Sequence, residues 1–132
     1  MTKNKKTKIL IVEDEVVISK AYAEELRDQG FLVFTAMNGS VGLEIATREK
    51  PDIILLDILM PVMDGLTMMS KLRESSLYGK NVPIILLTNL SASEEKILEA
   101  VTKDEPVYYL VKSDYTLSDV LEKIKECLKQ KK

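Results

Sequence analysis

The sequence predicts an α/β fold, with a parallel sheet of five strands that is covered by helices on both faces. Two observations support this class. Short runs of branched apolar residues alternate with segments of helical periodicity five times along the chain. The runs at residues 9–12 and 53–56 contain no polar residue, which is typical of parallel strands buried on both faces. This alternation implies right-handed crossovers between neighbouring parallel strands.

The predicted elements follow from the period of the apolar residues and from the residues that interrupt it. Strands are expected at residues 8–12, 31–35, 52–56, 83–87 and 107–111. Helices are expected at residues 16–29, 40–49, 65–74, 91–102 and 117–130. Gly30 is placed to end the first helix, and Asp64 to cap the third. Capping boxes are expected at residues 91–94 and 116–119.

Length and composition favour a single domain over residues 1–132, with no output domain. No linker rich in Gly, Ser or Pro divides the chain, and 45% hydrophobic with 30% charged residues is typical of a globular protein. The net charge of −2 argues neither for nor against a nucleic-acid partner. Because the basic residues at the two ends are not interleaved with aromatic residues, we expect no direct binding to nucleic acid.

The chain offers no sign of a membrane or secretory segment. No apolar stretch approaches the ~20 residues of a membrane span, and the start lacks the pattern of a signal peptide. Cys127 is the only cysteine, so no internal disulfide can form. It lies on the apolar face of the last predicted helix, which favours core packing over a redox role. A cytoplasmic location without membrane attachment is therefore expected.

Polar side chains stand at the carboxyl ends of four predicted strands, where ligands bind in open α/β sheets. They are Glu13 and Asp14 after the first strand, Asp57 at the third, Thr88 after the fourth and Lys112 after the fifth. Each alone has a structural explanation as a helix cap or a surface residue. Together, three carboxylates, a hydroxyl and an ammonium group predict a site for a phosphoryl group with a hard cation. Mg²⁺ is the cation that binds through one or two carboxylates and a phosphate oxygen.

Five sequence pieces in this order resemble the receiver domains of bacterial two-component response regulators, among them the single-domain chemotaxis type. The pieces are residues 9–15 (ILIVEDE), 51–57 (PDIILLD), 60–65 (MPVMDG), 84–88 (IILLT) and 109–112 (YLVK). The resemblance covers about residues 7–129. It implies a doubly wound, flavodoxin-like (βα)5 fold with the strand order 2-1-3-4-5.

The resemblance implies a role for each acidic residue. Asp57 would be the phosphoacceptor, and Glu13 and Asp14 would hold Mg²⁺ together with Asp57 and the backbone carbonyl of Leu59. The chemistry agrees with this assignment, because a carboxylate can attack phosphorus once the negative charge of the phosphoryl group is neutralised. The protein would not be an enzyme beyond its own phosphoryl transfer and slow dephosphorylation.

The remaining roles concern the phosphoryl oxygens and the output. By the resemblance, Thr88 and Lys112 contact the phosphoryl oxygens, and Thr88 and Tyr109 form the conformational switch. Their movement would remodel the face made by the predicted fourth helix, fifth strand and fifth helix. On spacing alone, Tyr109 is equally explained as an ordinary strand aromatic.

Partners are implied by composition and by the resemblance together. The chain has no histidine, so a phosphohistidine donor must come from a separate histidine kinase or phosphotransfer protein. Ile18 and Tyr22 are expected either near the donor's docking face or in ordinary packing. The downstream target is an unknown protein, and a phosphorylation-dependent dimer is possible.

Three parts of the chain depart from the family pattern: Ser113, Asn89 and residues 103–106 (KDEP), which replace the Gly-containing turn common before the fifth strand. Ser113 replaces the usual proline after Lys112, and because a cis bond before a non-proline residue costs about 2.5–4 kcal/mol, a trans bond is expected there. Asn89 is larger than the residue that usually follows Thr88, and Leu59 is apolar. Because Asn89 and Leu59 flank the route of a hydrolytic water, a long-lived phosphoryl state is expected.

Three alternatives stay open at this point. A receiver that binds partners without phosphorylation would share every motif. A phosphatase of the haloacid dehalogenase type would need a second aspartate two residues after Asp57, where the chain has Leu59. A flavodoxin-like mononucleotide binder would need a glycine- and hydroxyl-rich loop after the first strand, where the chain has three acidic residues.

Overall fold

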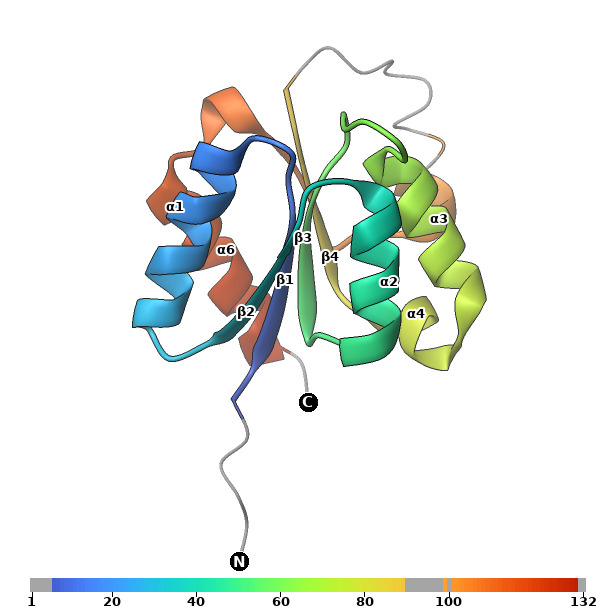
Figure 1. Ribbon diagram of the computed structural model, residues 1–132, viewed down its shortest axis with the longest axis horizontal. Helices are drawn as coiled ribbons and strands as arrows, with labels where there is room; N and C mark the ends of the chain where they lie inside the picture. The colour runs from blue at the N-terminus through green and yellow to red at the C-terminus, as the bar shows by residue number, and fades with distance from the viewer. Residues whose placement is uncertain (1–5, 90–98, 100, 131–132) are drawn as a thin grey trace, which may run out of the picture.

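The computed structural model describes residues 6–89, 99 and 101–130 (Figure 1). One parallel sheet of five strands has the order β2-β1-β3-β4-β5, which confirms the predicted class and strand order. The strands are β1 (Lys8–Val12), β2 (Leu32–Ala36), β3 (Ile53–Asp57), β4 (Ile84–Thr88) and β5 (Tyr108–Val111). Every strand boundary lies within one residue of its prediction, because apolar runs and their polar ends define strands well.

Helices cover both faces of the sheet. They are α1 (Val16–Asp28), α2 (Gly39–Glu49), α3 (Gly65–Ser75), α4 (Leu77–Asn81) and α6 (Leu117–Gln130), with a 3₁₀ turn η1 (Lys112–Asp114). In Figure 1, α1 and α6 lie on one side of the sheet and α2, α3 and α4 on the other. Of the helix predicted at 91–102, most residues, including its capping box, lie outside the described ones. No helix in the described part of the chain is long and apolar enough to cross a lipid bilayer.

The core consists of two layers, one on each face of the sheet. Because successive side chains of a strand point to opposite faces, Ile9 and Ile11 pack in one layer and Leu10 and Val12 in the other. Cys127 is buried in the first layer, so its predicted packing role is confirmed. These four β1 residues are fully or almost fully buried, as expected of an interior strand that lies between β2 and β3.

The structure also confirms three of the helix ends that were predicted from single residues or short motifs. Gly30 has a φ of +97°, the left-handed conformation expected of a glycine that ends a helix. Asp64 caps α3, since its Oδ1 accepts a hydrogen bond from the Thr67 N–H at 2.8 Å. Thr116 and Asp119 exchange two hydrogen bonds of 3.0 and 3.1 Å at the start of α6, as a capping box does.

Helix α4 was not predicted. It has only five residues, too few to show a helical period. Its start is fixed by Ser76, whose Oγ accepts a hydrogen bond from the Gly79 N–H at 3.0 Å. The Tyr78 hydroxyl donates to the carbonyl of Pro51, which ties α4 to the start of β3. Tertiary contacts, rather than local propensity, therefore hold this helix.

Candidate functional site

The register of the strands brings the predicted site residues to one edge of the sheet. The pairs at this edge are Val12 with Leu56, Asp57 with Leu87, and Thr88 with Val111. Glu13 and Asp14 follow directly after β1, and Lys112 directly after β5. Since parallel strands end at the same edge, side chains from four strands meet at the expected location for a ligand.

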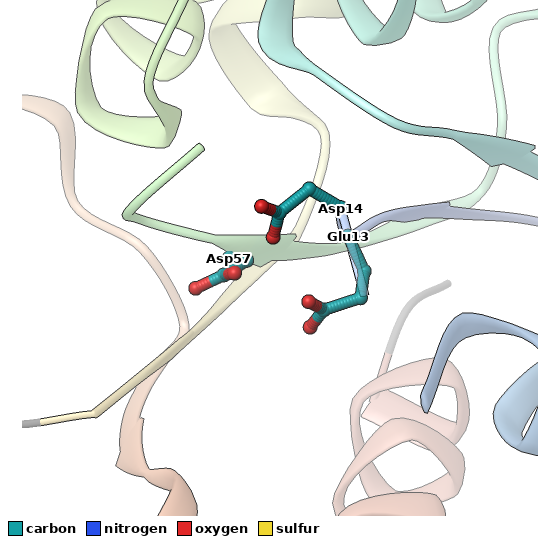
Figure 2. Close-up of side chains that lie close together, drawn as sticks. All are labelled: Glu13, Asp14 and Asp57. Atoms are coloured by element: carbon teal, nitrogen blue, oxygen red, sulfur yellow. The ribbon is translucent and has the colours of Figure 1, made fainter. Parts of the chain in front are cut away.

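Three carboxylates form the centre of this edge. Figure 2 shows Glu13 and Asp14 at the end of β1 beside Asp57 at the end of β3, and one carboxylate oxygen from each of the three lies within 4.8 Å of the other two. Glu13 is 3% exposed and Asp57 5% exposed, whereas Asp14 is half-buried. Like charges held so close and shielded from water repel one another, and a hard divalent cation is the usual compensation.

Lys112 supplies the positive charge on the other side of the cluster. Its Nζ lies 3.2 Å from Oε1 of Glu13 and 3.3 Å from Oδ2 of Asp57. The Lys112–Ser113 bond is trans, as expected from the serine, and the chain turns through η1 directly after β5. Lys112 therefore reaches the site without the proline that usually follows it in receiver domains.

The pKa values of the cluster reflect burial opposed by Lys112. Burial raises the pKa of Glu13 to about 7, although hydrogen bonds from the Glu15 N–H and from Lys112 act against this. Burial likewise raises the pKa of Asp57, and the charge of Lys112 opposes the increase. Burial alone would lower the pKa of Lys112, but the charges of Asp57 and Glu13 outweigh it and raise that pKa. One ammonium group thus compensates only part of the negative charge.

Thr88 completes the arrangement at the end of β4. Its side chain is fully buried, and its Oγ1 has no hydrogen-bond partner among the described residues. A buried hydroxyl without a partner is costly, and in a native protein such a group calls for an explanation. A ligand with acceptor oxygens, such as a phosphoryl group, would supply the missing partner.

The other predicted residues lie around this centre with different exposures. Leu59 and Asn89, the two residues predicted to flank the route of a hydrolytic water, are exposed. Tyr109 is 38% exposed on β5, beside Leu86 of β4.

The two residues of α1 that were expected either near a docking face or in packing belong to the core. Tyr22 is buried, and Ile18 packs against the same layer. The side chains that α1 exposes near the site are instead Val16 and Val17, which are 58% and 81% exposed. The sequence alone did not show which two of these four residues are buried and which two are exposed, because all four lie within two turns of the helix.

Gly65 has a role that the sequence alone did not show. A Cβ atom at this position would lie 2.1 Å from the backbone oxygen of Asp57, so only glycine fits. The Gly65 N–H also donates to the carbonyl of Ile58 at 2.8 Å. The start of α3 therefore sits directly against the backbone of the residue that carries the central carboxylate. In the sequence, Gly65 stood out as the last residue of the family piece 60–65, next to the expected helix cap Asp64, but its contact with the Asp57 backbone was not expected.

Comparison with known proteins agrees with the geometry. Residues 9–125 match the response regulator receiver domain family. The chain belongs to this family. This receiver domain is 33% identical over 126 residues to the transcriptional regulatory protein PrrA of Mycobacterium tuberculosis, and the match covers 94% of this chain and 51% of PrrA. The chain spans about half the length of the curated relatives that it matches.

Solved receiver domains have the same fold. A CheY-like receiver domain protein from Methanospirillum hungatei superposes with a TM-score of 0.84 at 28% identity, covering 96% of each chain. The BeF3-activated N-terminal receiver domain of RstA from Klebsiella pneumoniae gives a TM-score of 0.78 at 30% identity, covering 94% of this chain and 100% of that one. The predicted resemblance is confirmed, and family membership sets aside the phosphatase and mononucleotide-binding alternatives.

Proposed function

We propose that this receiver domain accepts a phosphoryl group on Asp57 from a phosphohistidine of a separate histidine kinase or phosphotransfer protein. The observation that supports the proposal is the set of charged groups around Asp57. Its carboxylate lies at the end of β3, is paired with Lys112 at 3.3 Å and has two further carboxylates beside it. No residue of this chain can itself be the phosphohistidine donor, since the 132 residues contain no histidine.

In the transfer, an Oδ atom of Asp57 attacks phosphorus as the P–N bond to the donor imidazole breaks. The electron pair of that bond stays on the imidazole nitrogen, and an acyl phosphate forms on Asp57. Lys112 lies where it can neutralise a phosphoryl oxygen, and the unpartnered Thr88 hydroxyl can donate a hydrogen bond to another. Catalysis then rests on position and charge, without a general acid or base.

The acidic residues fit a Mg²⁺ ion. Asp14 and Asp57 would hold it with Glu13 and the backbone carbonyl of Leu59, a set of oxygen ligands that suits this cation. When bound, Mg²⁺ neutralises negative charge on the approaching phosphoryl group. Both carboxylate oxygens of Glu13 already have partners, since Oε1 pairs with Lys112 and Oε2 accepts from the Glu15 N–H at 3.1 Å. Asp14 is the more accessible ligand.

The signal would leave the domain as a change of shape. Thr88 gains a partner when a phosphoryl oxygen arrives, and Tyr109, which is partly exposed, then turns inward. The change would remodel the face of β5 and α6 with the helical residues 101–104 beside them. The recipient is a protein whose identity the chain does not specify, or a second copy of the domain.

Three further assignments belong to this proposal. We infer a cytoplasmic location, in line with the resemblance to receiver domains. We also infer that the domain turns over no external substrate, apart from its own phosphorylation and slow dephosphorylation. We also expect no direct binding to nucleic acid, because the basic residues at the two ends of the sequence are not interleaved with aromatic residues.

Intact mass spectrometry tests the central claim. The protein is incubated with acetyl phosphate, with and without Mg²⁺, beside Asp57→Asn and beside Asp28→Asn as an exposed control. A single Mg²⁺-dependent phosphoryl adduct, present in Asp28→Asn and absent in Asp57→Asn, is expected. If neither acetyl phosphate nor phosphorylated histidine kinases give an adduct, the alternative of a receiver that binds partners without phosphorylation is favoured.

A further inference from the structure

The loop between β3 and α3, residues 58–64, is held in a strained conformation beside the acidic cluster. Its tip is a three-residue turn in which the Met63 N–H donates to the Pro61 carbonyl at 2.7 Å. Val62, at the centre of the turn, has a φ of +67° and is 83% exposed. A β-branched residue is rarely found at positive φ, and the exposed side chain gains no packing that would compensate. Other contacts must therefore hold the turn.

The contact that holds it comes from the first residue of α2. The Gly39 N–H, at the start of α2, donates to the Met63 carbonyl at 2.8 Å. The first N–H groups of a helix have no partner within the helix, so this bond satisfies both groups. A Cβ atom at position 39 would lie 2.4 Å from the same carbonyl oxygen. Only glycine allows the start of α2 and the loop to approach this closely.

The same loop is also tied to the backbone next to Asp57, through Gly65. Its far end is fixed where the Gly65 N–H donates to the Ile58 carbonyl at 2.8 Å and where the Gly65 Cα packs against the Asp57 backbone. Met63 lies two residues before Gly65, and Leu59 lies within the loop. A shift of the Met63 carbonyl therefore moves the backbone that borders the central carboxylate.

We propose that Gly39 is a positioning residue for the metal and phosphoryl site, which it controls through its hydrogen bond to Met63. The bond keeps the strained Val62 turn closed and so keeps the β3–α3 loop in place beside Asp57. This inference rests on the proposed binding of Mg²⁺ by Asp14, Asp57 and the loop. In Gly39→Ala the added methyl group displaces the Met63 carbonyl, the Val62 turn relaxes, and the loop leaves the position that Mg²⁺ requires.

Calorimetric titration with Mg²⁺ tests the inference. Gly39→Ala should weaken Mg²⁺ binding by about tenfold, the lower end of what loss of a supporting contact costs a metal site. Gly30→Ala is the matched control, because a side chain at φ +97° also destabilises the fold but has no neighbour within 4 Å and lies before β2, at the end of the sheet opposite the site. Its Mg²⁺ affinity should stay within about twofold of the unchanged protein.

A second substitution separates positioning from general damage. Glycine adopts positive φ without strain, so Val62→Gly removes the need for the restraint. Adding Val62→Gly to Gly39→Ala should therefore restore part of the lost Mg²⁺ affinity. If Val62→Gly weakens binding further in that background, the inference is wrong.

Hydrogen exchange of the unchanged protein gives a test that needs no variant. If the Gly39 bond favours Mg²⁺ binding, then Mg²⁺ must favour the bond to the same extent. Mg²⁺ should slow exchange of the Gly39 amide more than that of the Gly30 amide, which donates to Arg27 at 2.9 Å. Equal Mg²⁺ affinity in Gly39→Ala and the unchanged protein overturns this inference and leaves the proposed function intact. Absence of Mg²⁺ binding by the unchanged protein overturns both.

Discussion

The Nζ atom of Lys112 lies 3.3 Å from Oδ2 of Asp57, although the two residues are 55 positions apart in the chain. The same Nζ lies 3.2 Å from Glu13, so one ammonium group joins the ends of β1, β3 and β5. The charges at these strand ends therefore affect both the proposed binding of Mg²⁺ and a phosphoryl group and the stability of the fold.

Loss of the Lys112 charge should destabilise the fold. In Lys112→Met the two buried carboxylates of Glu13 and Asp57 lose their only cationic partner in the described structure. We expect the free energy of unfolding in Mg²⁺-free buffer at pH 8 to fall by about 2–4 kcal/mol. Urea denaturation measures it.

The control for this change is Lys103→Met. Lys103 makes an ion pair with Glu74 at 3.6 Å, but both side chains are more than 60% exposed. We expect a loss below about 1 kcal/mol for this variant, as for most surface pairs. A loss in Lys112→Met no larger than in the control would show that the buried pairs contribute nothing net.

Glu13 should make the metal-free protein less stable as the pH rises. Its pKa is raised from 4.5 to about 7 in the folded state, so between these values the folded state holds a proton that the unfolded chain has released. Stability therefore falls as the pH rises through this window. Glu13→Gln should remove this part of the slope and stabilise the metal-free protein at pH 8 by an amount on the order of 1 kcal/mol.

Urea denaturation at a series of pH values from 4.5 to 8, in the presence of a chelator, measures the slope in both proteins. The Gln side chain keeps an oxygen that can accept the hydrogen bond from the Glu15 N–H, so local structure is preserved. Parallel pH profiles for the two proteins would contradict the prediction. Added Mg²⁺ should stabilise the unchanged protein more than Glu13→Gln.

The acyl phosphate on Asp57 should decay over minutes or longer. Leu59 is exposed beside the site and offers no side-chain hydrogen bond to an attacking water. Leu59→Asn should speed the decay, because an amide at this position can orient a water molecule. Loss of the phosphoryl mass from the purified adduct gives the rate. Decay of the unchanged protein within seconds is the outcome that contradicts the prediction.

Arg73 should be a major source of stability at the opposite end of the sheet from Asp57. Its guanidinium donates to the carbonyls of Val82 at 2.7 Å, Asp104 at 2.8 Å and Gly79 at 2.9 Å. These bonds join α3 to the end of α4 and to the segment before β5. Arg73→Met leaves these three acceptors, and the Glu105 carbonyl at 3.5 Å, without this donor, and we expect the free energy of unfolding to fall by about 2–4 kcal/mol.

Arg48→Met is the matched control for Arg73. The Arg48 side chain is 57% exposed and pairs only with Glu49 of the same helix among the described residues. Its loss should cost less than about 0.5 kcal/mol by urea denaturation. A similar cost for both variants would mean that the carbonyls released by Arg73 find water at little expense.

Much of the fold was available from the sequence because its signals are local. The period of apolar residues placed all five strands to within one residue, and single residues such as Gly30 and Asp64 marked helix ends. Helix α4 was not predicted, because five residues are too few to show a helical periodicity of apolar residues. The candidate site was also accessible, since polar residues at the ends of apolar runs must gather at one edge of a parallel sheet.

The sequence by itself determined the fold class, the strand order through the family resemblance, and which five polar residues share the carboxyl edge. Only the tertiary structure decided that Lys112 divides its charge between Glu13 and Asp57, that Tyr22 is buried, and that the Gly39 N–H binds Met63. The physical reason is the range of the interactions. Periodicity reflects neighbours along the chain, whereas these contacts depend on the register and distance between segments that meet only when the sheet has formed.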